Sequence, residues 1–182
     1  MDELIDILDT EGKFTGQTTM KSNAHQKGLF HPTIHVWFYT KDGQVLIQKR
    51  GKDKATFPLL WDVSVAGHVG SGEAIEKSAI REIEEEIGLI ISEENLQKIG
   101  VFKSEHQHGP NFIDCEFHHT YLCKLNVPLT QLKKQDSEVD ALSMIPIAQF
   151  ESEINDDLAS QKYVPHHAEY YQTILTAIKT LL

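Results

Sequence analysis

Cysteine is scarce in this sequence, which has 182 residues but only two cysteines, Cys115 and Cys123. Both fall within one predicted strand, where their spacing corresponds to roughly 26 Å, too far for a disulfide bond. The sequence also lacks an apolar run of membrane-spanning length. Its start, Met1-Asp2-Glu3, lacks the basic region and apolar core of a signal peptide. We therefore expect a cytoplasmic protein without disulfide bonds and without a membrane partner.

Positive charge is also in short supply, because 17 lysines and arginines face 27 aspartates and glutamates, which gives a net charge of −10. This balance argues against a nucleic acid polymer or an anionic membrane as a general partner. A phosphate-bearing substrate is still compatible with it, because bound cations supply positive charge locally. The length and the 40% hydrophobic content predict one domain, residues 1–182, with its own core.

Apolar periodicity and turn residues predict the order of the elements. An N-terminal hairpin is expected over about residues 3–20, followed by a polar stretch at 21–30 that is irregular or forms one helical turn. Strands are expected at 33–40, 44–49, 61–66, 96–106, 112–125 and 138–145. A short helical piece is expected at 146–150, and a C-terminal helix over about 165–182 has Pro165 at its first position. Strands alternating with helices indicate a layered α/β domain.

The stretch 67–89 carries the strongest chemical signal in the chain. On a helix, Glu82, Glu85 and Glu86 stand at positions i, i+3 and i+4, so three carboxylates share one face. Like charges at this spacing repel, and a divalent cation such as Mg²⁺ or Mn²⁺ reverses that effect. An adjacent apolar stripe gives the helix a side to bury, formed by Ile80, Ile83 and Ile87.

The ends of this helix are marked by residues typical of helix termini. Ser71 is expected to cap the helix, and Glu73 is expected in the first turn, where the helix dipole favours negative charge. Gly88 stands where a left-handed residue ends a helix. The predicted unit is therefore a glycine-rich loop, a helix with its carboxylates near the end, and a second loop.

The same stretch resembles the Nudix box, G-x5-E-x7-R-E-U-x-E-E-x-G-U, in which U is a bulky aliphatic residue. Every specified position is filled, by Gly67, Glu73, Arg81, Glu82, Ile83, Glu85, Glu86, Gly88 and Leu89. The resemblance implies a Nudix-type α/β/α sandwich with a central mixed sheet. The competing interpretation is a solvated acidic helix face, in which the glycines and the arginine occupy these positions by accident.

The resemblance also implies a chemistry, the hydrolysis of a diphosphate linkage in a small X-diphosphate compound. Such cleavage needs charge neutralisation on the phosphate oxygens, a positioned water and a base. Mg²⁺ (or Mn²⁺) is implied as the cofactor, and it lowers the pKa of a bound water. Its implied ligands are Glu82, Glu85, Glu86 and, as an additional ligand, the Gly67 carbonyl. Glu73 and Arg81 are expected to pair and brace the box.

The base and the phosphate contacts are less sharply assigned by the sequence. Glu85 is one candidate for the base, and a later loop glutamate, here Glu138, is the other. Glu138 is equally compatible with a surface acid at the start of a strand. Arg50 and Lys54 are candidates for phosphate binding, with an exposed strand-end arginine and a charge at the rim of the site as the alternative interpretations.

A second, narrower resemblance covers residues 24 to about 125 and points to isopentenyl-diphosphate isomerase, a relative with the Nudix fold. It rests on the segments 24–31, 45–50 and 56–68, and it implies a second metal site formed by His25, His31, His68, Asp114 and Glu116. That set suits Mg²⁺, Mn²⁺ or Zn²⁺. Each histidine alone is also compatible with a surface or hydrogen-bonded side chain. The isomerase needs a cysteine just before its Gly-His pair, and this chain has Ala66 there.

The leading hypothesis is therefore a metal-dependent diphosphate hydrolase on an isomerase-like branch of the Nudix family. An isopentenyl-diphosphate isomerase-like enzyme and a non-catalytic diphosphate-binding module are the alternatives. The X group, the identity of the base and the occupancy of the histidine site are left open by the sequence. A homodimer is possible through the N-terminal hairpin or the C-terminal helix.

Overall fold

The computed structural model describes residues 2–182, and its main chain forms nine strands and four α-helices over that range. The strands are β1 (Leu4–Leu8), β2 (Phe14–Met20), β3 (His31–Tyr39), β4 (Gln44–Arg50), β5 (Trp61–Asp62), β6 (Val65–His68), β7 (Gln97–Gly109), β8 (Phe112–Lys124) and β9 (Val139–Pro146). The helices are α1 (Lys21–Lys27), α2 (Ile75–Ile87), α3 (Ile147–Ile154) and α4 (Ala168–Leu181). Short 3₁₀ turns are η1 (Glu93–Asn95), η2 (Leu129–Gln131) and η3 (Ala159–Lys162).

Strand β3 is the centre of a seven-stranded sheet. It pairs in parallel with β8 along its whole length, from His31 opposite Glu116 to Tyr39 opposite Lys124. Its pairings with β4 and β6 are antiparallel, and so is the long β7–β8 hairpin. The central sheet is therefore mixed, as the sequence predicts.

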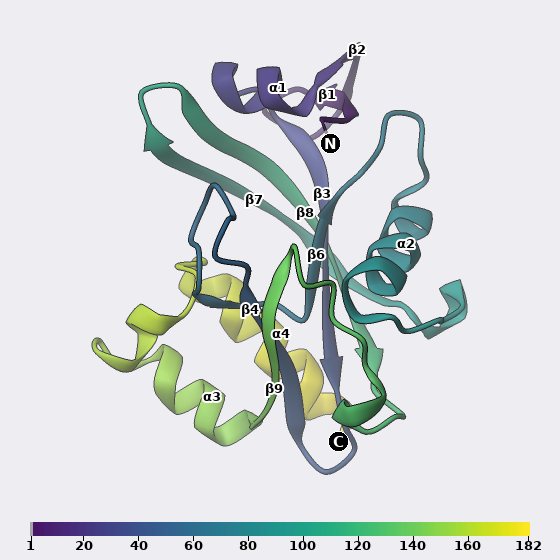
Figure 1. The fold of residues 1–182 in the computed structure, drawn as a ribbon, viewed down its shortest axis with the longest axis vertical. Coiled ribbons are helices and arrows are strands. Elements are labelled where there is room, and N and C mark those ends of the chain that lie inside the picture. The colour runs from purple at the N-terminus through teal and green to yellow at the C-terminus, as the bar shows by residue number, and fades with distance from the viewer. Residues whose placement is uncertain (1) are drawn as a thin grey trace.

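Alternation along β3 divides the core into two layers. Ile34, Val36 and Phe38 face α2, where they pack with its buried isoleucines. Trp37 and Tyr39 face the opposite way, into a second cluster built on α3 and α4. Figure 1 shows α2 on one side of the sheet and α3 and α4 on the other. This arrangement is the α/β/α sandwich expected from the sequence.

Helix α2 ends as predicted but begins later than predicted. Gly88 adopts the left-handed conformation at its C-terminus, with φ of 67°. The helix starts at Ile75, so Ser71 does not cap it and Glu73 lies before its first turn. The Ser71 hydroxyl instead donates to the Asp6 carboxylate at 2.6 Å, which ties the loop to β1. A tertiary contact thus replaces the local cap.

The strand expected at 61–66 is divided into β5 and β6, which pair with different neighbours. Ser64 lies at the break, buried, where its hydroxyl accepts from the Phe38 amide at 2.9 Å and donates to the Leu46 carbonyl. These bonds fill a gap between β3 and β4, whose direct pairing is confined to Tyr39 and Val45. The hydrogen bonds of Ser64 therefore mark the point at which the chain passes from pairing with β4 to pairing with β3.

Two further boundaries differ from expectation. Helix α4 begins at Ala168 rather than Pro165, because the Val164 amide donates a hydrogen bond to the Trp61 carbonyl at 2.8 Å, which keeps Val164 in an extended conformation outside the helix. The polar stretch after the hairpin forms α1 over Lys21–Lys27, which is longer than one turn. Within residues 2–182, no helix is long and apolar enough to cross a membrane.

The N-terminal unit of β1, β2 and α1 lies at one end of the sheet, beyond the start of β3 (Figure 1). Ile5, Ile7 and Ala24 form its small core. Helix α1 buries His25, so this unit brings one histidine to the end of β3. That position matters for the site described next.

Candidate active site

The carboxylates of α2 lie against the end of β6. Glu82 packs so closely on Gly67 that a Cβ at position 67 would lie 2.1 Å from the Glu82 Cδ. Only glycine therefore leaves room for this carboxylate beside the main chain of β6. Burial raises the pKa of Glu82 to about 6, against the opposing charge of Arg81.

Glu86 is the most deeply placed of the three carboxylates. Its Oε2 accepts from the Gln48 amide at 3.1 Å and lies 3.3 Å from the Ala66 amide nitrogen. Burial raises the pKa of Glu86 to about 8, although the charge of Lys54 opposes the shift. Glu85, in contrast, has a side chain that is 51% exposed.

Arg81 forms hydrogen bonds to several residues of the Nudix box. Its guanidinium donates to both Glu73 oxygens, at 3.2 and 3.1 Å, and to Glu82 at 2.7 Å. It also donates to the His68 carbonyl at 3.1 Å, which links α2 to the end of β6. Glu73 accepts further bonds from Ser78 and from the Gly70 amide. Both residues therefore occupy the bracing positions that the sequence analysis gave them.

The donor set at this end of α2 fits a divalent cation. Glu86 is buried and forms no ion pair within residues 2–182, while Glu82 is half-buried and shares Arg81 with Glu73. The cradle that Gly67 leaves beside Glu82 would be closed by any side chain at position 67. Oxygen-only donors of this kind suit Mg²⁺ or Mn²⁺.

The other predicted residues of the hydrolytic site lie on loops beside this cluster. Glu138 precedes β9, is 39% exposed and forms an ion pair with Lys54. Arg50 lies at the end of β4 and ion-pairs with the buried Asp62 at 2.8 Å. Two more of its N–H groups donate to Thr56. These contacts use three of the five N–H groups of Arg50, which also lines the cavity described below, so phosphate binding by Arg50 stays a prediction.

A second group of potential ligands gathers at the start of β3. His25, His31, His68 and Glu116 each offer an atom within 4.8 Å of the others. The Nε2 atoms of His31 and His68 are buried without a hydrogen-bond partner, and the Glu116 Oε1 lies 3.5 and 3.6 Å from them. Orphaned ring nitrogens facing one carboxylate are the donor set of a metal site, so these residues fit a divalent cation.

The electrostatics of this histidine cluster follow from its burial. Burial lowers the pKa of His68 well below its ordinary value, which leaves its ring neutral and free to ligate. Burial would raise the pKa of Glu116, but the neighbouring rings of His31, His118 and His68 hold it well below its usual range. Burial opposes a charge on His31, yet the nearby Glu116 raises the pKa of His31. The neutral His68 ring next to an ionised Glu116 is the protonation pattern that a cation requires.

Asp114, the fifth ligand implied by the sequence, has a different place. Its two carboxylate oxygens contact His25 Nδ1 at 2.7 Å and His108 Nε2 at 2.8 Å. Asp114 therefore orients the His25 ring through its Nδ1 and is not one of the four residues whose ligand atoms gather at this site. His108 had no role in the sequence analysis, because its position near the tip of the β7–β8 hairpin gives no signal of this contact.

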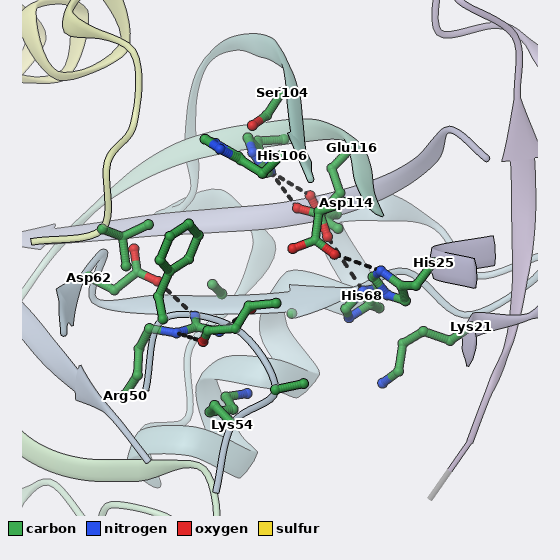
Figure 2. Close-up of a pocket in the computed structure, with 18 of the residues that line it drawn as sticks. Lys21, His25, Arg50, Lys54, Asp62, His68, Ser104, His106, Asp114 and Glu116 are labelled. Carbon is green, nitrogen blue, oxygen red and sulfur yellow. Dashed lines mark hydrogen bonds and ion pairs between the residues drawn. The ribbon is translucent and has the colours of Figure 1, made fainter. Parts of the chain in front are cut away.

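A cavity of about 350 Å³ connects the two groups. His25, His68 and Glu116 line one part of it, and Ala66, Gly67 and Lys54 line the part next to the box. Figure 2 shows His68 from β6, Glu116 from β8, His25 from α1 and Lys54 from the loop after β4 around this cavity. Several lining residues were missed by sequence reasoning: Thr33, His35, Asp62, Ser104, His106, His118 and His166. Among these, His118 follows Asp114 and Glu116 at the two-residue spacing that places side chains on one face of a strand, which is a signal that could have found it.

The fold and the site together define an α/β/α sandwich with an acidic helix and a polar cavity at one strand end. A family model described as the NUDIX domain matches residues 29–171. The chain therefore belongs to the Nudix hydrolase family, as the box predicted.

Individual relatives agree with this assignment. An uncharacterised Nudix hydrolase of Clostridium acetobutylicum is 32% identical over 203 residues, covering 97% of both chains. Nudix hydrolase 3 of Arabidopsis thaliana is 32% identical over 91% of this chain, which spans only 22% of that relative's length. Isopentenyl-diphosphate Delta-isomerase 2 of Photorhabdus laumondii is 31% identical over 67% of each chain. The isomerase-like branch seen in the sequence is thus also confirmed.

Among solved structures, DR0079 from Deinococcus radiodurans superposes with a TM-score of 0.63. It is 18% identical and covers 89% of this chain and all of its own. This likeness concerns the fold, and it confirms the Nudix-type sandwich with a mixed sheet.

Proposed function

We propose that the protein is a metal-dependent hydrolase that cleaves the diphosphate linkage of a small X-diphosphate compound. The observation that carries this proposal is the complete carboxylate box, in which Glu82 packs on Gly67 and Glu86 is buried without an ion pair within residues 2–182. A buried acid without a compensating charge is unfavourable for folding, so its presence in a family of hydrolases supports a role in holding a cation.

Glu82, Glu85, Glu86 and the Gly67 carbonyl would hold Mg²⁺ or Mn²⁺. The cation supplies positive charge to the diphosphate oxygens and lowers the pKa of a bound water. Glu85 is the base we favour, because its carboxylate is half exposed and its contact with Arg81 is long, at 3.4 Å. Glu138 forms a closer ion pair with Lys54. Lys54 also lines the cavity and would supply positive charge to a bound phosphate.

The experiment compares two neighbouring glutamates on α2. Glu85→Gln removes the proposed base, and Glu84→Gln removes an exposed carboxylate that the Nudix box leaves unspecified. With Mg²⁺ and a panel of nucleoside diphosphates, nucleotide sugars, dinucleotides and isopentenyl diphosphate, we expect Glu85→Gln to lower turnover by about 10²–10⁴-fold. Glu84→Gln should match the wild type. Equal turnover by Glu85→Gln on every compound that the wild type cleaves would refute the assignment of the base.

An isomerase-type reaction on isopentenyl diphosphate is the second candidate. It is favoured by the convergence of His25, His31, His68 and Glu116 and by the isomerase relative. Ala66 argues against it, because a methyl group has no proton to exchange with carbon. Incubation with isopentenyl diphosphate in D₂O with metal tests it directly. Deuterium in the recovered compound would support isomerisation, and its absence would discard this candidate.

A further inference from the structure

The inner part of the cavity is lined by polar side chains that neither the Nudix box nor the histidine cluster uses. His35 on β3, His118 on β8 and Ser104 on β7 all line it, and they are only 5%, 4% and 7% exposed. Pairing of Ser104 opposite Glu116 places the serine next to the histidine cluster. Figure 2 shows Ser104 and Glu116 on the same side of the cavity.

The two histidine rings are stacked, with centroids 4.0 Å apart and planes inclined by 14°. Each ring uses its Nδ1 within the protein: His35 with the Tyr170 hydroxyl and His118 with the Thr33 hydroxyl, both at 2.7 Å. No hydrogen bond to the Nε2 of either ring is formed within residues 2–182. Neither Nε2 is among the partnerless nitrogens sealed from solvent. Both are therefore open to whatever occupies the cavity.

The Nδ1 of His35 is part of a hydrogen-bond chain with Tyr170 and Trp37. The Trp37 indole can only donate, and it donates to the Tyr170 oxygen at 2.8 Å. The Tyr170 hydroxyl also lies 2.7 Å from His35 Nδ1 and forms a side-chain hydrogen bond with Thr120. Burial, together with the charges of His118 and His166, holds the pKa of His35 well below its ordinary value, so the ring is neutral. His35 therefore presents an uncharged Nε2 to the cavity, which donates or accepts a hydrogen bond according to the ring tautomer.

Ser104 adds a third group with unused capacity. Its hydroxyl makes no hydrogen bond within residues 2–182, and the residue is more than nine-tenths buried. A buried polar atom without a partner is unfavourable unless water or a ligand supplies one. Together with the Nε2 atoms of His35 and His118, the Ser104 hydroxyl forms a group of three polar atoms that face one cavity.

We propose that His35, His118 and Ser104 form a subsite that binds a compact, uncharged X group bearing hydroxyls. This inference rests on the diphosphate hydrolysis proposed above, since the same cavity continues to Gly67 and Lys54 beside the box. The hydroxyls of a short polyol or of one sugar ring match two uncharged ring nitrogens and a serine hydroxyl, because a hydroxyl both donates and accepts. The cavity of about 350 Å³ also has to hold the diphosphate, so the X group that shares it is compact.

A hydrocarbon X group is disfavoured by the same geometry. It would displace the water that satisfies these three atoms and offer no hydrogen bond in return. Sites built to hydrogen-bond a substrate reject analogues that lack the group, because their own polar atoms are left unpaired. The subsite thus separates this chain from enzymes that take an isopentenyl chain.

The test measures binding, so that it does not depend on turnover. Calorimetry with Mg²⁺ would compare two methylene-bridged diphosphonates with X groups of equal size, dihydroxypropyl and isopentenyl. We expect the dihydroxypropyl compound to bind the wild type at least about tenfold more tightly. Ser104→Ala should weaken it by about three- to tenfold and leave the isopentenyl compound unchanged. Ser152→Ala, which alters an exposed serine on α3, is the matched control and should change neither.

His35→Phe gives a second, independent test, because it keeps an aromatic ring against His118 and removes the His35 Nε2. This variant should show a smaller difference in affinity between the dihydroxypropyl and the isopentenyl compounds than the wild type shows. Equal or tighter binding of the isopentenyl compound by the wild type would overturn the subsite, as would the absence of binding by both. Failure of hydrolysis in the Glu85 comparison would leave these affinities unaffected, so the two proposals fail separately.

Discussion

Gly67→Ala tests the contact between β6 and the acidic helix. The added methyl carbon would lie 2.1 Å from Cδ and 2.4 Å from Cγ of Glu82. Carbon atoms in contact stay about 3.5 Å apart, so the carboxylate has to move by about 1.4 Å. A displacement of about 1 Å at a catalytic group can lower the rate about a hundredfold. The folding penalty is smaller, about 1 kcal/mol, because a glutamate side chain can change rotamer.

The assay pairs initial rates of diphosphate cleavage with urea unfolding. Gly109→Ala is the control, since a Cβ at Gly109 would meet nothing within 4 Å. We expect Gly67→Ala to lose at least about a hundredfold in kcat while its free energy of unfolding changes by about 1 kcal/mol. Turnover by Gly67→Ala within threefold of the control would refute the view that Gly67 positions Glu82 for chemistry.

Three further predictions concern the rest of the site. Asp62→Asn should lower the free energy of unfolding by about 3 kcal/mol at pH 7, because it breaks a buried ion pair. The folded pKa of Asp62 lies below the unfolded value of about 3.9, so this stability is present above pH 4 and is lost as the pH falls; an equal difference at pH 7 and pH 2.5 would contradict it. Mn²⁺ at a hundredfold its Kd should raise the free energy of unfolding by about 2.7 kcal/mol for each site that it occupies. His31→Gln should abolish the part of this increase that comes from the histidine cluster. An equal increase in the free energy of unfolding in His31→Gln and the wild type would rule out Mn²⁺ binding at the cluster. Glu138→Gln should lower turnover less than tenfold, whereas a fall of about 10²–10⁴-fold would transfer the role of base from Glu85 to Glu138.

The sequence predicted those features that local pattern determines. The spacing of Glu82, Glu85 and Glu86 and the glycine at 88 place the acidic helix and its end without tertiary information. Apolar residues on both faces of the stretch 33–40 favour a central strand covered on both sides, and β3 is buried along its whole length. The family resemblance then supplied the layering.

The features that were missed depend on contacts between segments far apart in the chain. Ser71 is a good helix cap by type, yet its hydroxyl binds Asp6, 65 residues away. Asp114 has the alternation of a metal ligand on β8, but His108 from the facing strand takes its second oxygen. Nothing in the local sequence around His35 shows that it stacks on His118, since only the parallel pairing of β3 with β8 brings them together.

The central claim is that this chain uses metal-bound water to split a diphosphate linkage. The most direct measurement is ³¹P NMR of the wild-type protein with Mg²⁺ and the substrate panel in water enriched in ¹⁸O. The account predicts that one compound loses its diphosphate resonances and that one phosphate product shows the ¹⁸O isotope shift. If all phosphorus resonances of the panel persist with metal present, or if cleavage occurs without ¹⁸O entering either product, hydrolysis by activated water is contradicted.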